Sequence, residues 1–571
     1  TFHYERNGND FSPPAGVFDR LTRDAEYWTL TSRDNEQTWR FQETVTGLGV
    51  LVEWRDRRGN TLRFTHDLNG QDAWRTGATV PRPPLTGIID ATNRTITVVP
   101  DDKGRIGAFI LPDLRRFNFG YDERGDLVSI TDANTPVRGV HSYTYDERHR
   151  IVEQRDPEGI LFLTNRYDDR DRIIEQRDAV QTPSFFSYDP LKGTTIFTDN
   201  LRLRHIYSYD ALNRVTGETD PLDPTLYTKY DPSYNITHTT DARSNTTEYR
   251  YDIRGNLTER HDPLPEPPGA CRAVGYSEDV TTWTYTGDNL VETMTDALSN
   301  SWSYKYDSEG NLIQVVAPIG ETGATYDEWG QLETFTDANR HITTYRYDSH
   351  GNLRETEDAR TGISRSTYDI TGRELSYTDA NSHTVFFEYS GNDQIVRLTD
   401  PKGRATTFRY DRNDLLLSTT DRVGTTREFR YDDNLKLIAE RDHPTGAWQT
   451  YAYDKLYRRV ATTDRLGYVT GFDYDSVGQL VKLREPNGAS TQYAYDGDGN
   501  LTQVTDALGG VTAMAYDALG RLAASTDAAG SAVEYCYDAE DRLMRTVGPR
   551  AGEIYSYSYD CLLYTSDAAD E

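Results

Sequence analysis

The sequence is organised by a phrase of seven residues, Tyr-Asp-x-x-Gly-Asn-Leu, which is complete at residues 251–257, 306–312, 347–353 and 495–501. Looser copies run from residue 121 to residue 559, and 14 of the 20 intervals between copies are 21 residues long. A fixed period of this size indicates a repeat architecture. We call the first residue of each copy the key tyrosine. The key tyrosines are residues 121, 145, 167, 188, 209, 230, 251, 285, 306, 326, 347, 368, 389, 410, 431, 453, 474, 495, 516, 537 and 559.

Each repeat has a second mark eleven residues after the key tyrosine, the +11 position, which holds Asp in 17 of 20 repeats and Ala317, Glu485 or Gly548 in the others. The best copy is Thr-Asp-Ala-Leu-Gly at residues 505–509. Asp bonds its own backbone two residues on, and Gly supplies positive φ, so both residues form turns. Two turns per repeat leave two short segments, which is the spacing of β-hairpins.

We expect the turn residues and key tyrosines of the clearest copies to define the fold. They are Tyr251, Asp252, Gly255, Tyr306, Asp307, Gly310, Tyr347, Asp348, Gly351, Tyr495, Asp496, Gly499, Asp506, Tyr516, Asp517 and Gly520.

Aromatic residues also stand two places before the key tyrosine in 16 of 21 copies, as at Tyr345 and Phe429. Side chains two apart share one face of a strand. Stacked repeats should therefore set ladders of aromatic rings beside one another. Position +6 is apolar in 17 of 20 repeats, as at Leu501. We predict that both arms of the repeat are β-strands.

Composition agrees with a thin sheet better than with a compact core, because only 36% of the 571 residues are hydrophobic while 40 are Tyr. The formal net charge is −30, and many of the acids occupy the two turns. A nucleic-acid-binding face would need a basic stripe, so we expect no nucleic-acid partner. No run approaches the roughly 18 apolar residues of a membrane helix, so we expect no membrane span.

The chain divides into three parts. Residues 1–110 form a β-rich lead-in with degenerate repeats, in which His66 and Pro100 take the place of the key tyrosine. Residues 111–560 are the repeat array, with a Pro-rich insertion at about 263–275. Residues 561–571 break the period and are interpreted as a translated sequencing adaptor. Residue 1 is Thr rather than Met, so we expect the N-terminus to be that of a fragment.

The sequence contains no recognisable catalytic or metal-binding motif. The stretch that starts at Asp496 begins like a calcium loop, but Leu501 and Ala507 stand where that loop needs Gly and Glu. We find no His-Glu-x-x-His, nucleophile elbow or P-loop. Cys271 and Cys536 are scattered and indicate neither a disulfide framework nor a metal site. We therefore expect no catalytic residue, no cofactor and no enzyme activity.

The array resembles the YD-repeat (Rhs) family, which includes Rhs polymorphic toxins, the shell subunits of insecticidal toxin complexes, and teneurins. The residues that carry the resemblance are Tyr-Asp-x-x-Gly-Asn/Arg-Leu followed by Thr-Asp-Ala/Pro-x-Gly, over about 121–560. The resemblance implies an all-β fold: a long antiparallel β-ribbon that spirals into a hollow shell, incomplete here. It also implies a secreted or cell-surface bacterial protein. About 40 strands at ~4.8 Å would make an open sheet on the order of 190 Å long, which favours coiling.

Two functions remain open at this stage. The first is a non-catalytic shell fragment that encapsulates and delivers a C-terminal toxin or effector. The core-ending cleavage region and the toxin domain of Rhs toxins do not occur in this sequence, so neither self-cleavage nor toxicity is assigned to any residue. The alternative is a cell-surface protein that binds carbohydrate, or a neighbouring cell, through exposed aromatic turns.

Overall fold

The computed structural model describes residues 5–7, 10–12, 19–24, 26–32, 37–43, 49–67, 83–133, 139–221, 225–263, 280–297, 299–318, 320–443, 446–537, 542–550 and 553–557. These residues form 51 β-strands joined by turns, and they contain no helix. The predicted insertion at about 263–275, except residue 263, lies outside the described residues, as do Cys271, key tyrosine 559 and the tail at 561–571. The all-β prediction is confirmed for the described part of the chain.

The strands of the lead-in precede the regular array. They are β1 (Glu5–Asn7), β2 (Asp10–Ser12), β3 (Arg20–Arg23), β4 (Tyr27–Thr31), β5 (Gln37–Glu43), β6 (Gly49–Asp56), β7 (Thr61–His66), β8 (Leu85–Ile89), β9 (Thr95–Pro100) and β10 (Ile106–Ile110). β7 ends at His66 and β9 ends at Pro100, the places that stand for the key tyrosine in the degenerate repeats.

In the array, odd-numbered strands lead to the key tyrosine, and all of those from β11 to β49 except β17 end on it. They are β11 (Arg116–Tyr121), β13 (Val140–Tyr145), β15 (Leu161–Tyr167), β17 (Pro183–Asp189), β19 (Arg204–Tyr209), β21 (Thr225–Tyr230), β23 (Thr246–Tyr251), β25 (Val280–Tyr285), β27 (Ser301–Tyr306), β29 (Gly320–Tyr326), β31 (Ile342–Tyr347), β33 (Ile363–Tyr368), β35 (Thr384–Tyr389), β37 (Ala405–Tyr410), β39 (Thr426–Tyr431), β41 (Gln449–Tyr453), β43 (Val469–Tyr474), β45 (Ser490–Tyr495), β47 (Val511–Tyr516), β49 (Ala532–Tyr537) and β51 (Ile554–Ser556).

Even-numbered strands of the array begin six residues after the key tyrosine. They are β12 (Leu127–Thr131), β14 (Ile151–Arg155), β16 (Ile173–Arg177), β18 (Thr194–Thr198), β20 (Val215–Thr219), β22 (Ile236–Thr240), β24 (Leu257–His261), β26 (Val291–Thr295), β28 (Leu312–Ala317), β30 (Leu332–Thr336), β32 (Leu353–Glu357), β34 (Glu374–Thr378), β36 (Ile395–Thr399), β38 (Leu416–Thr420), β40 (Leu437–Asp442), β42 (Arg459–Thr463), β44 (Leu480–Arg484), β46 (Leu501–Thr505), β48 (Leu522–Thr526) and β50 (Leu543–Val547).

Every strand pairs with its neighbours in sequence, always antiparallel, so the chain forms one continuous meander. The register shifts at the key tyrosine, where Tyr251 faces Leu257 although Arg250 faces Glu259. The outgoing strand thus carries one extra residue, a β-bulge. The same shift recurs at Tyr306, Tyr347 and Tyr495. Bulges bend and twist a sheet, and their repetition gives the ribbon a steady curvature.

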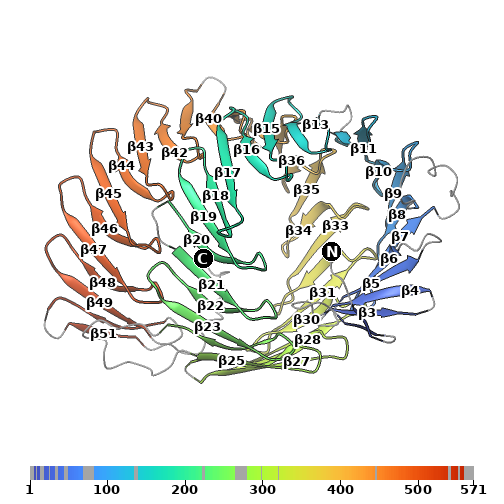
Figure 1. Cartoon of the computed structure of the whole chain (residues 1–571), viewed down its shortest axis with the longest axis horizontal. Coiled ribbons are helices and arrows are strands. Elements are labelled where there is room, and N and C mark those ends of the chain that lie inside the picture. Colours follow the sequence, from blue (N-terminus) through green and yellow to red (C-terminus); the bar gives the residue numbers. More distant parts are fainter. Residues whose placement is uncertain are drawn as a thin grey trace.

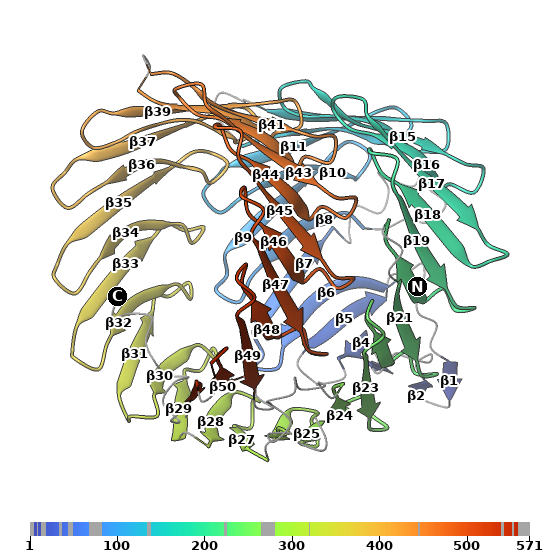
Figure 2. The ribbon, with the colours of Figure 1, turned by 90° about the vertical axis from the view of Figure 1, so that its left-hand side faces the viewer.

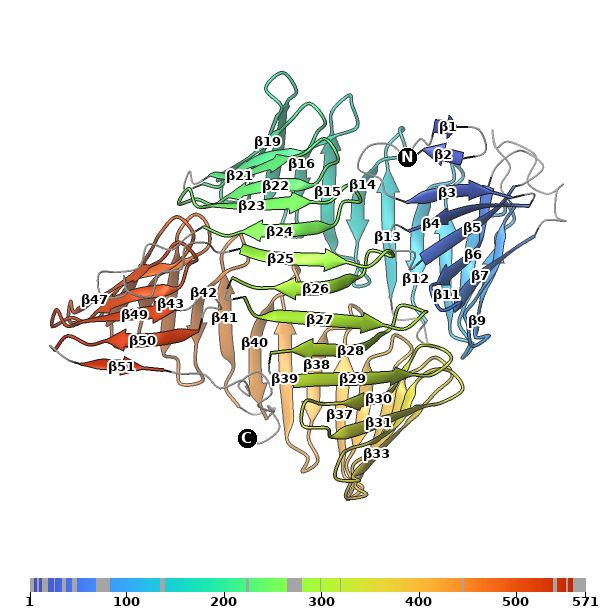
Figure 3. The ribbon, with the colours of Figure 1, turned by 90° about the horizontal axis from the view of Figure 1, so that it is seen from below.

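The curved ribbon makes about two turns around an open centre (Figure 1). It passes from β3 through β16 to β24, and then runs around again from β25 through β36 to β51. Figures 2 and 3 show the same wall from the side and from below, with neighbouring hairpins laid beside one another. We call β1–β24 the first coil and β25–β51 the second coil. The predicted spiral is therefore observed, and its described ends, β1 and β51, are not paired with each other.

The wall is one sheet thick, and no large side chain of the described residues is fully buried. In the hairpin of β23 and β24, Arg250 donates to Glu259 on one face, while Tyr249 lies opposite Arg260 on the other. Because there is no second layer, the stability of the ribbon rests on strand pairing, on turns and on contacts between coils rather than on a core.

Both turns of the repeat have one geometry, set by the aspartate that begins them. In the turn after Tyr251, the Asp252 carboxylate accepts hydrogen bonds from the backbone N–H groups of Arg254 and Asn256, both at 2.9 Å. Gly255 has a φ of 83° and donates to the Asp252 carbonyl. The +11 turn of Asp506 repeats this arrangement. The predicted roles of Asp and Gly thus apply to the two kinds of turn, which we call YD turns and +11 turns.

Thr361 occupies the glycine place of one +11 turn with a φ of 64°, a conformation that β-branched residues rarely adopt. We expect Thr361→Gly to stabilise its hairpin by about 1 kcal/mol, because the strain disappears. Gly424 holds the same place in the turn of Asp421, with a φ of 90° and no atom within 4 Å of the place that a Cβ would take. Gly424→Thr should therefore destabilise its own hairpin by about the same amount. Hydrogen exchange of the two hairpins measures both changes, and equal signs would contradict the strain argument.

The key tyrosine ties each repeat to the one before it. The hydroxyl of Tyr347 donates to the carbonyl of Leu332 at 3.0 Å, and that of Tyr495 donates to the carbonyl of Leu480 at 2.9 Å. Tyr306 and Tyr516 make the same bond. In several repeats an arginine also covers the ring, as Arg172 covers Tyr188 at 4.2 Å.

In place of the predicted ladder of stacked rings, the key tyrosines join repeats by hydrogen bonds from their hydroxyl groups to backbone carbonyls. The aromatic pairs of the described residues are Phe11–Trp28, Phe109–Phe119, Phe186–Phe197 and Phe197–His205, and none of these pairs joins two key tyrosines. The physical reason is that a tyrosine at a strand end can reach a free carbonyl of the neighbouring hairpin, and a buried hydroxyl gains more from a hydrogen bond than from ring contact alone.

Candidate functional site: the seam between the coils

The two coils meet along a seam at which +11 turns of the first coil contact YD turns of the second. Ala179 donates its backbone N–H to Asn434 Oδ1 at 3.1 Å, and Asn413 Nδ2 donates to Asp156 Oδ2 at 2.7 Å. These partners are 255 and 257 residues apart. One coil thus holds twelve repeats, so that the repeat of Tyr145 lies against that of Tyr410.

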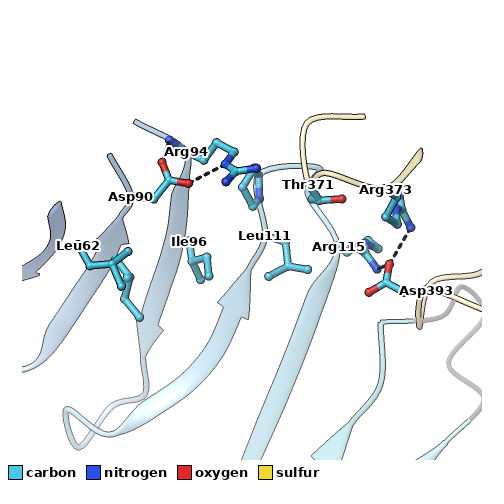
Figure 4. A pocket seen from close by; sticks show the side chains of 11 residues that line it. Leu62, Asp90, Arg94, Ile96, Leu111, Arg115, Thr371, Arg373 and Asp393 are labelled. Atoms are coloured by element: carbon cyan, nitrogen blue, oxygen red, sulfur yellow. Dashed lines mark hydrogen bonds and ion pairs between the residues drawn. The ribbon is translucent and has the colours of Figure 1, made fainter. Parts of the chain in front are cut away.

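A cluster of charges joins the two coils just after the lead-in (Figure 4). Arg115 contacts Asp393 of the second coil at 2.6 Å and Asp113 of its own turn at 2.5 Å. Arg373 of the second coil contacts Asp393 at 3.0 Å, Asp113 at 3.3 Å and Asp369 at 2.6 Å. Two guanidinium groups and three carboxylates thus bridge the coils, and four of the five side chains are no more than about a fifth exposed.

A cavity of about 330 Å³ lies beside this cluster. Leu62, Ile96 and Leu111 line the cavity below Asp90 and Arg94, and Arg115, Arg373 and Asp393 stand at its other side (Figure 4). The charged groups at the rim form ion pairs with one another. For example, Arg94 Nε lies 2.6 Å from Asp90 Oδ2. The described residues that line the cavity include no His, Cys or Lys. The chemistry of the cavity is therefore that of a packed contact between coils.

The arginines hold several turn carboxylates in the charged form. Burial raises the pKa of Asp369, but hydrogen bonds from Thr371 and Arg373 outweigh it and lower the pKa to about 2. A hydrogen bond from Arg150 lowers the pKa of Asp146 to about 2, and one from Arg172 does the same for Asp168. Asp411 has no such arginine, and burial is the main cause that raises its pKa.

These shifts predict acid lability. A carboxylate whose pKa falls on folding stabilises the native state above its unfolded pKa of 3.8, and that stabilisation is lost as pH drops toward 2. We expect the β-sheet circular dichroism to be constant from pH 7 to about pH 4 and to disappear between about pH 4 and pH 2. Unfolding completed above pH 5 would contradict this assignment. Arg373→Met should shift the onset upward, because Asp369 loses the donor that keeps it ionised.

The structure distributes the predicted repeat-defining residues among three places. The YD turns that contain Asp307 with Gly310, Asp496 with Gly499, and Asp517 with Gly520 lie at the seam, where Arg58 bonds Asn311, Arg243 bonds Asp498, and Arg243 Nη1 donates to the Asp517 carbonyl at 2.9 Å. The turn of Asp252 and Gly255 lies on the outer edge of the first coil, and that of Asp506 on the outer edge of the second, where Ile253 and Leu508 are exposed. The turn of Asp348 and Gly351 is bonded by Gln331 of the preceding repeat at 2.8 Å.

No metal-ion cluster of three or more His, Cys, Asp or Glu side chains occurs among the described residues. The calcium-like stretch at Asp496 is an ordinary YD turn, whose carboxylate accepts from Asp498 N, Asn500 N and Asn500 Nδ2. Within the described part of the chain, no helix is long and apolar enough to cross a membrane. Cys536 is disulfide-bonded, which the scattered spacing of the cysteines did not indicate.

Sequence reasoning missed the seam itself. The residue five places after the key tyrosine, typically Asn or Arg, carries part of it: Asn311 and Arg373 both occupy this place. The sequence signal was the recurrence of Asn and Arg at this place. The geometry of the turn does not by itself require a side chain that donates hydrogen bonds beyond the turn. Their partners in the first coil have no signal of their own, because they are more than 250 residues away.

Comparison with known proteins agrees with this architecture. The RHS repeat model matches residues 121–160, 230–265, 326–363, 389–426, 474–511 and 495–532. The crystal structure of TcdB2-TccC3-TEV is similar with a TM-score of 0.57 and 12% identity, over 98% of this chain and 42% of that one. The Photorhabdus luminescens Tc holotoxin pore with a mutated TccC3 has a TM-score of 0.58 and 12% identity, over 97% and 36%. No curated protein matches the sequence.

A single-layered ribbon of YD hairpins, coiled and joined edge to edge, defines the class: the chain contains RHS repeats, six of which match the family model. Within that class, it shares its fold with the TcdB2-TccC3 chains of Tc toxins, of which it spans about two-fifths. At 12% identity the likeness concerns the fold alone.

Proposed function

We propose that this chain is a stretch of shell wall from a secreted Rhs-type toxin of bacterial origin, and that the complete protein encloses a C-terminal toxin or effector. The observation that carries the proposal is the seam. A ribbon that only curved would leave gaps between its coils, whereas charge pairs and turn-to-turn hydrogen bonds join these coils into a continuous wall. A continuous wall of this kind can separate an enclosed polypeptide from the surrounding solution.

The wall has no catalytic part in this proposal, and it needs neither a cofactor nor a nucleic acid. Its integrity depends on the tyrosine, aspartate and glycine of each repeat. Residues 1–110 act as the lead-in and residues 111–560 as the array. The enclosed partner is the C-terminal effector, and its chemistry is set by sequence beyond this chain.

A protection experiment tests the proposal. The complete protein, with the region that follows the repeats, is treated with protease, and the cleavage of that region is timed. We expect the enclosed region to survive until the wall is opened. The double variant Arg115→Met, Arg373→Met opens the seam at the charge cluster and should speed cleavage, whereas Arg346→Met, at an arginine that is 43% exposed and paired within one hairpin, should not. Cleavage of the wild-type region as fast as that of the same region expressed alone would refute encapsulation.

A second function is favoured by exposed aromatic rings in turns. Trp329, Tyr234 and Tyr468 are each more than two-fifths exposed. Aromatic rings can stack on sugar rings, which suits a surface that binds carbohydrate at a cell. A glycan array probed with wild type and with the triple alanine variant of these residues checks this second function. Binding that is lost in the variant supports it, and an array without binding rejects it.

A further inference from the structure

The coiled ribbon has two outer edges that the seam does not use. One consists of the +11 turns of the second coil, exemplified by Asp421, Asp464 and Asp506, and we call it the upper edge. The other consists of the YD turns of the first coil, exemplified by those that follow Tyr188 and Tyr251, and we call it the lower edge. These names refer to the seam, which lies between them.

The upper edge is open and apolar at its tips. A methyl group placed at Gly424, Gly467 or Gly509 would have nothing within 4 Å. Leu466 is 81% exposed and Leu508 is 97% exposed, each two residues after the turn aspartate. Isolated exposed leucines are common, but Val423, which is 75% exposed, holds the same place in a third turn of this edge. Asn487 holds that place in the turn between the two leucines, so the apolar residues recur without being continuous. This recurrence along one edge indicates an interaction surface.

The lower edge has the same character. Leu191 is 98% exposed three residues after Tyr188, and Ile253 is fully exposed two residues after Tyr251. Charged side chains are exposed on both sides as well: Arg422 on the upper edge, and Glu147, Arg148, Asp169 and Arg170 on YD turns of the first coil. Exposure alone is compatible with a solvated surface. In the seam, however, an edge of +11 turns packs against an edge of YD turns, so edges of these two kinds can bind each other.

The seam joins an edge of +11 turns to an edge of YD turns. In it, Arg243, two residues after Asp241, bonds Asp498, three residues after Tyr495. Leu466 and Leu191 occupy these same two places on the upper and lower edges. At this pair of turns, the two places that hold an ion pair in the seam therefore hold leucines at the outer edges, which is the pairing that an apolar contact needs.

We propose that a second copy of this chain docks its lower edge on the upper edge, so that copies stack head to tail in continuation of the spiral. The seam fixes the register. One coil advances twelve repeats, and a copy displaced by two coils places its Tyr188 repeat on the Tyr453 repeat, which brings Leu191 to Leu466. The contact is heterologous and does not close on itself, so it permits growth beyond a dimer. It does not depend on any enclosed cargo.

Complementary edge variants test the stacking. Leu466→Asp with Leu508→Asp blocks the upper edge, and Leu191→Asp with Ile253→Asp blocks the lower edge. Sedimentation velocity over a concentration series of wild type should show species that grow with concentration. Each variant alone should remain a monomer. A mixture of the two should form a one-to-one dimer and nothing larger, because only one intact edge of each kind is left.

Phe386→Asp is the matched control, since Phe386 is 53% exposed but lies within β35 rather than at an edge. It should associate like wild type. All of these positions are exposed, so circular dichroism should show the variants folded. A wild type that stays monomeric at every concentration overturns the proposal. So does an edge variant that associates with itself, or a control that loses association as completely as the edge variants.

Discussion

Replacing Arg373 by methionine is expected to release the second coil from the first at the charge cluster, with a loss of about 3 kcal/mol in local stability. Arg373 stands between Asp113 of the first coil and Asp369 and Asp393 of the second. Without it, Asp369, which is 17% exposed, loses its arginine partner, and Asp113, which is 14% exposed, keeps Arg115 alone. Hydrogen exchange at the turns of Asp113 and Asp369 should accelerate about a hundredfold.

Arg346→Met provides the comparison for this experiment. Arg346 also contacts two carboxylates, Glu355 at 2.6 Å and Glu357 at 3.1 Å, but it is 43% exposed and its partners belong to its own hairpin. Water can reach the Arg346 side of this pair, and Glu355, which is 16% exposed, keeps Arg365 at 2.8 Å, so exchange there should change little. If both variants accelerated exchange equally, the seam would have no special part in stability.

The hairpins could be predicted from sequence because their causes are local. Asp252 and Gly255 are three residues apart, and the hydrogen bonds and positive φ that they supply stay within five residues of chain. The same holds for Asp506 and Gly509. Repetition then reinforced the signal, since the turn chemistry recurs at a constant spacing over hundreds of residues.

The contacts between repeats and between coils could not be predicted in the same way. A tyrosine two places after an aromatic residue fits a ring ladder as well as it fits the observed bond from Tyr347 to the Leu332 carbonyl, because both put the ring on one face. The seam is harder still. Arg115 and Asp393 are 278 residues apart, and their meeting depends on a curvature that accumulates over twelve bulged hairpins. No local sequence pattern reveals this accumulated curvature.

The second large effect is expected at the aspartate of a buried YD turn. Asp517 is 7% exposed, and its carboxylate accepts from Leu519 N and Arg521 N, both at 3.0 Å, and from Arg521 Nε at 2.8 Å. Asp517→Ala removes these acceptors and takes the partner carboxylate from Arg521, which is 12% exposed. We expect a loss of about 3 kcal/mol, seen as roughly hundredfold faster exchange in the hairpin of β47 and β48.

Asp527→Ala in the +11 turn of the same repeat separates turn chemistry from burial. Asp527 makes the equivalent bonds, from Ala529 N at 2.9 Å and Ser531 N at 2.8 Å, but its turn is exposed on the upper edge. Water can satisfy the released N–H groups, so exchange should rise only about tenfold or less. Asp517→Asn should fall between the two, because an amide oxygen still accepts from the backbone while the charge facing Arg521 is lost. Equal losses of local stability in Asp517→Ala and Asp527→Ala would mean that the aspartate stabilises its hairpin only through the geometry of the turn, and that burial at the seam adds nothing. The expected difference instead assigns the larger part to the seam side, where the YD turn is buried against the first coil and Arg243 bonds its carbonyl.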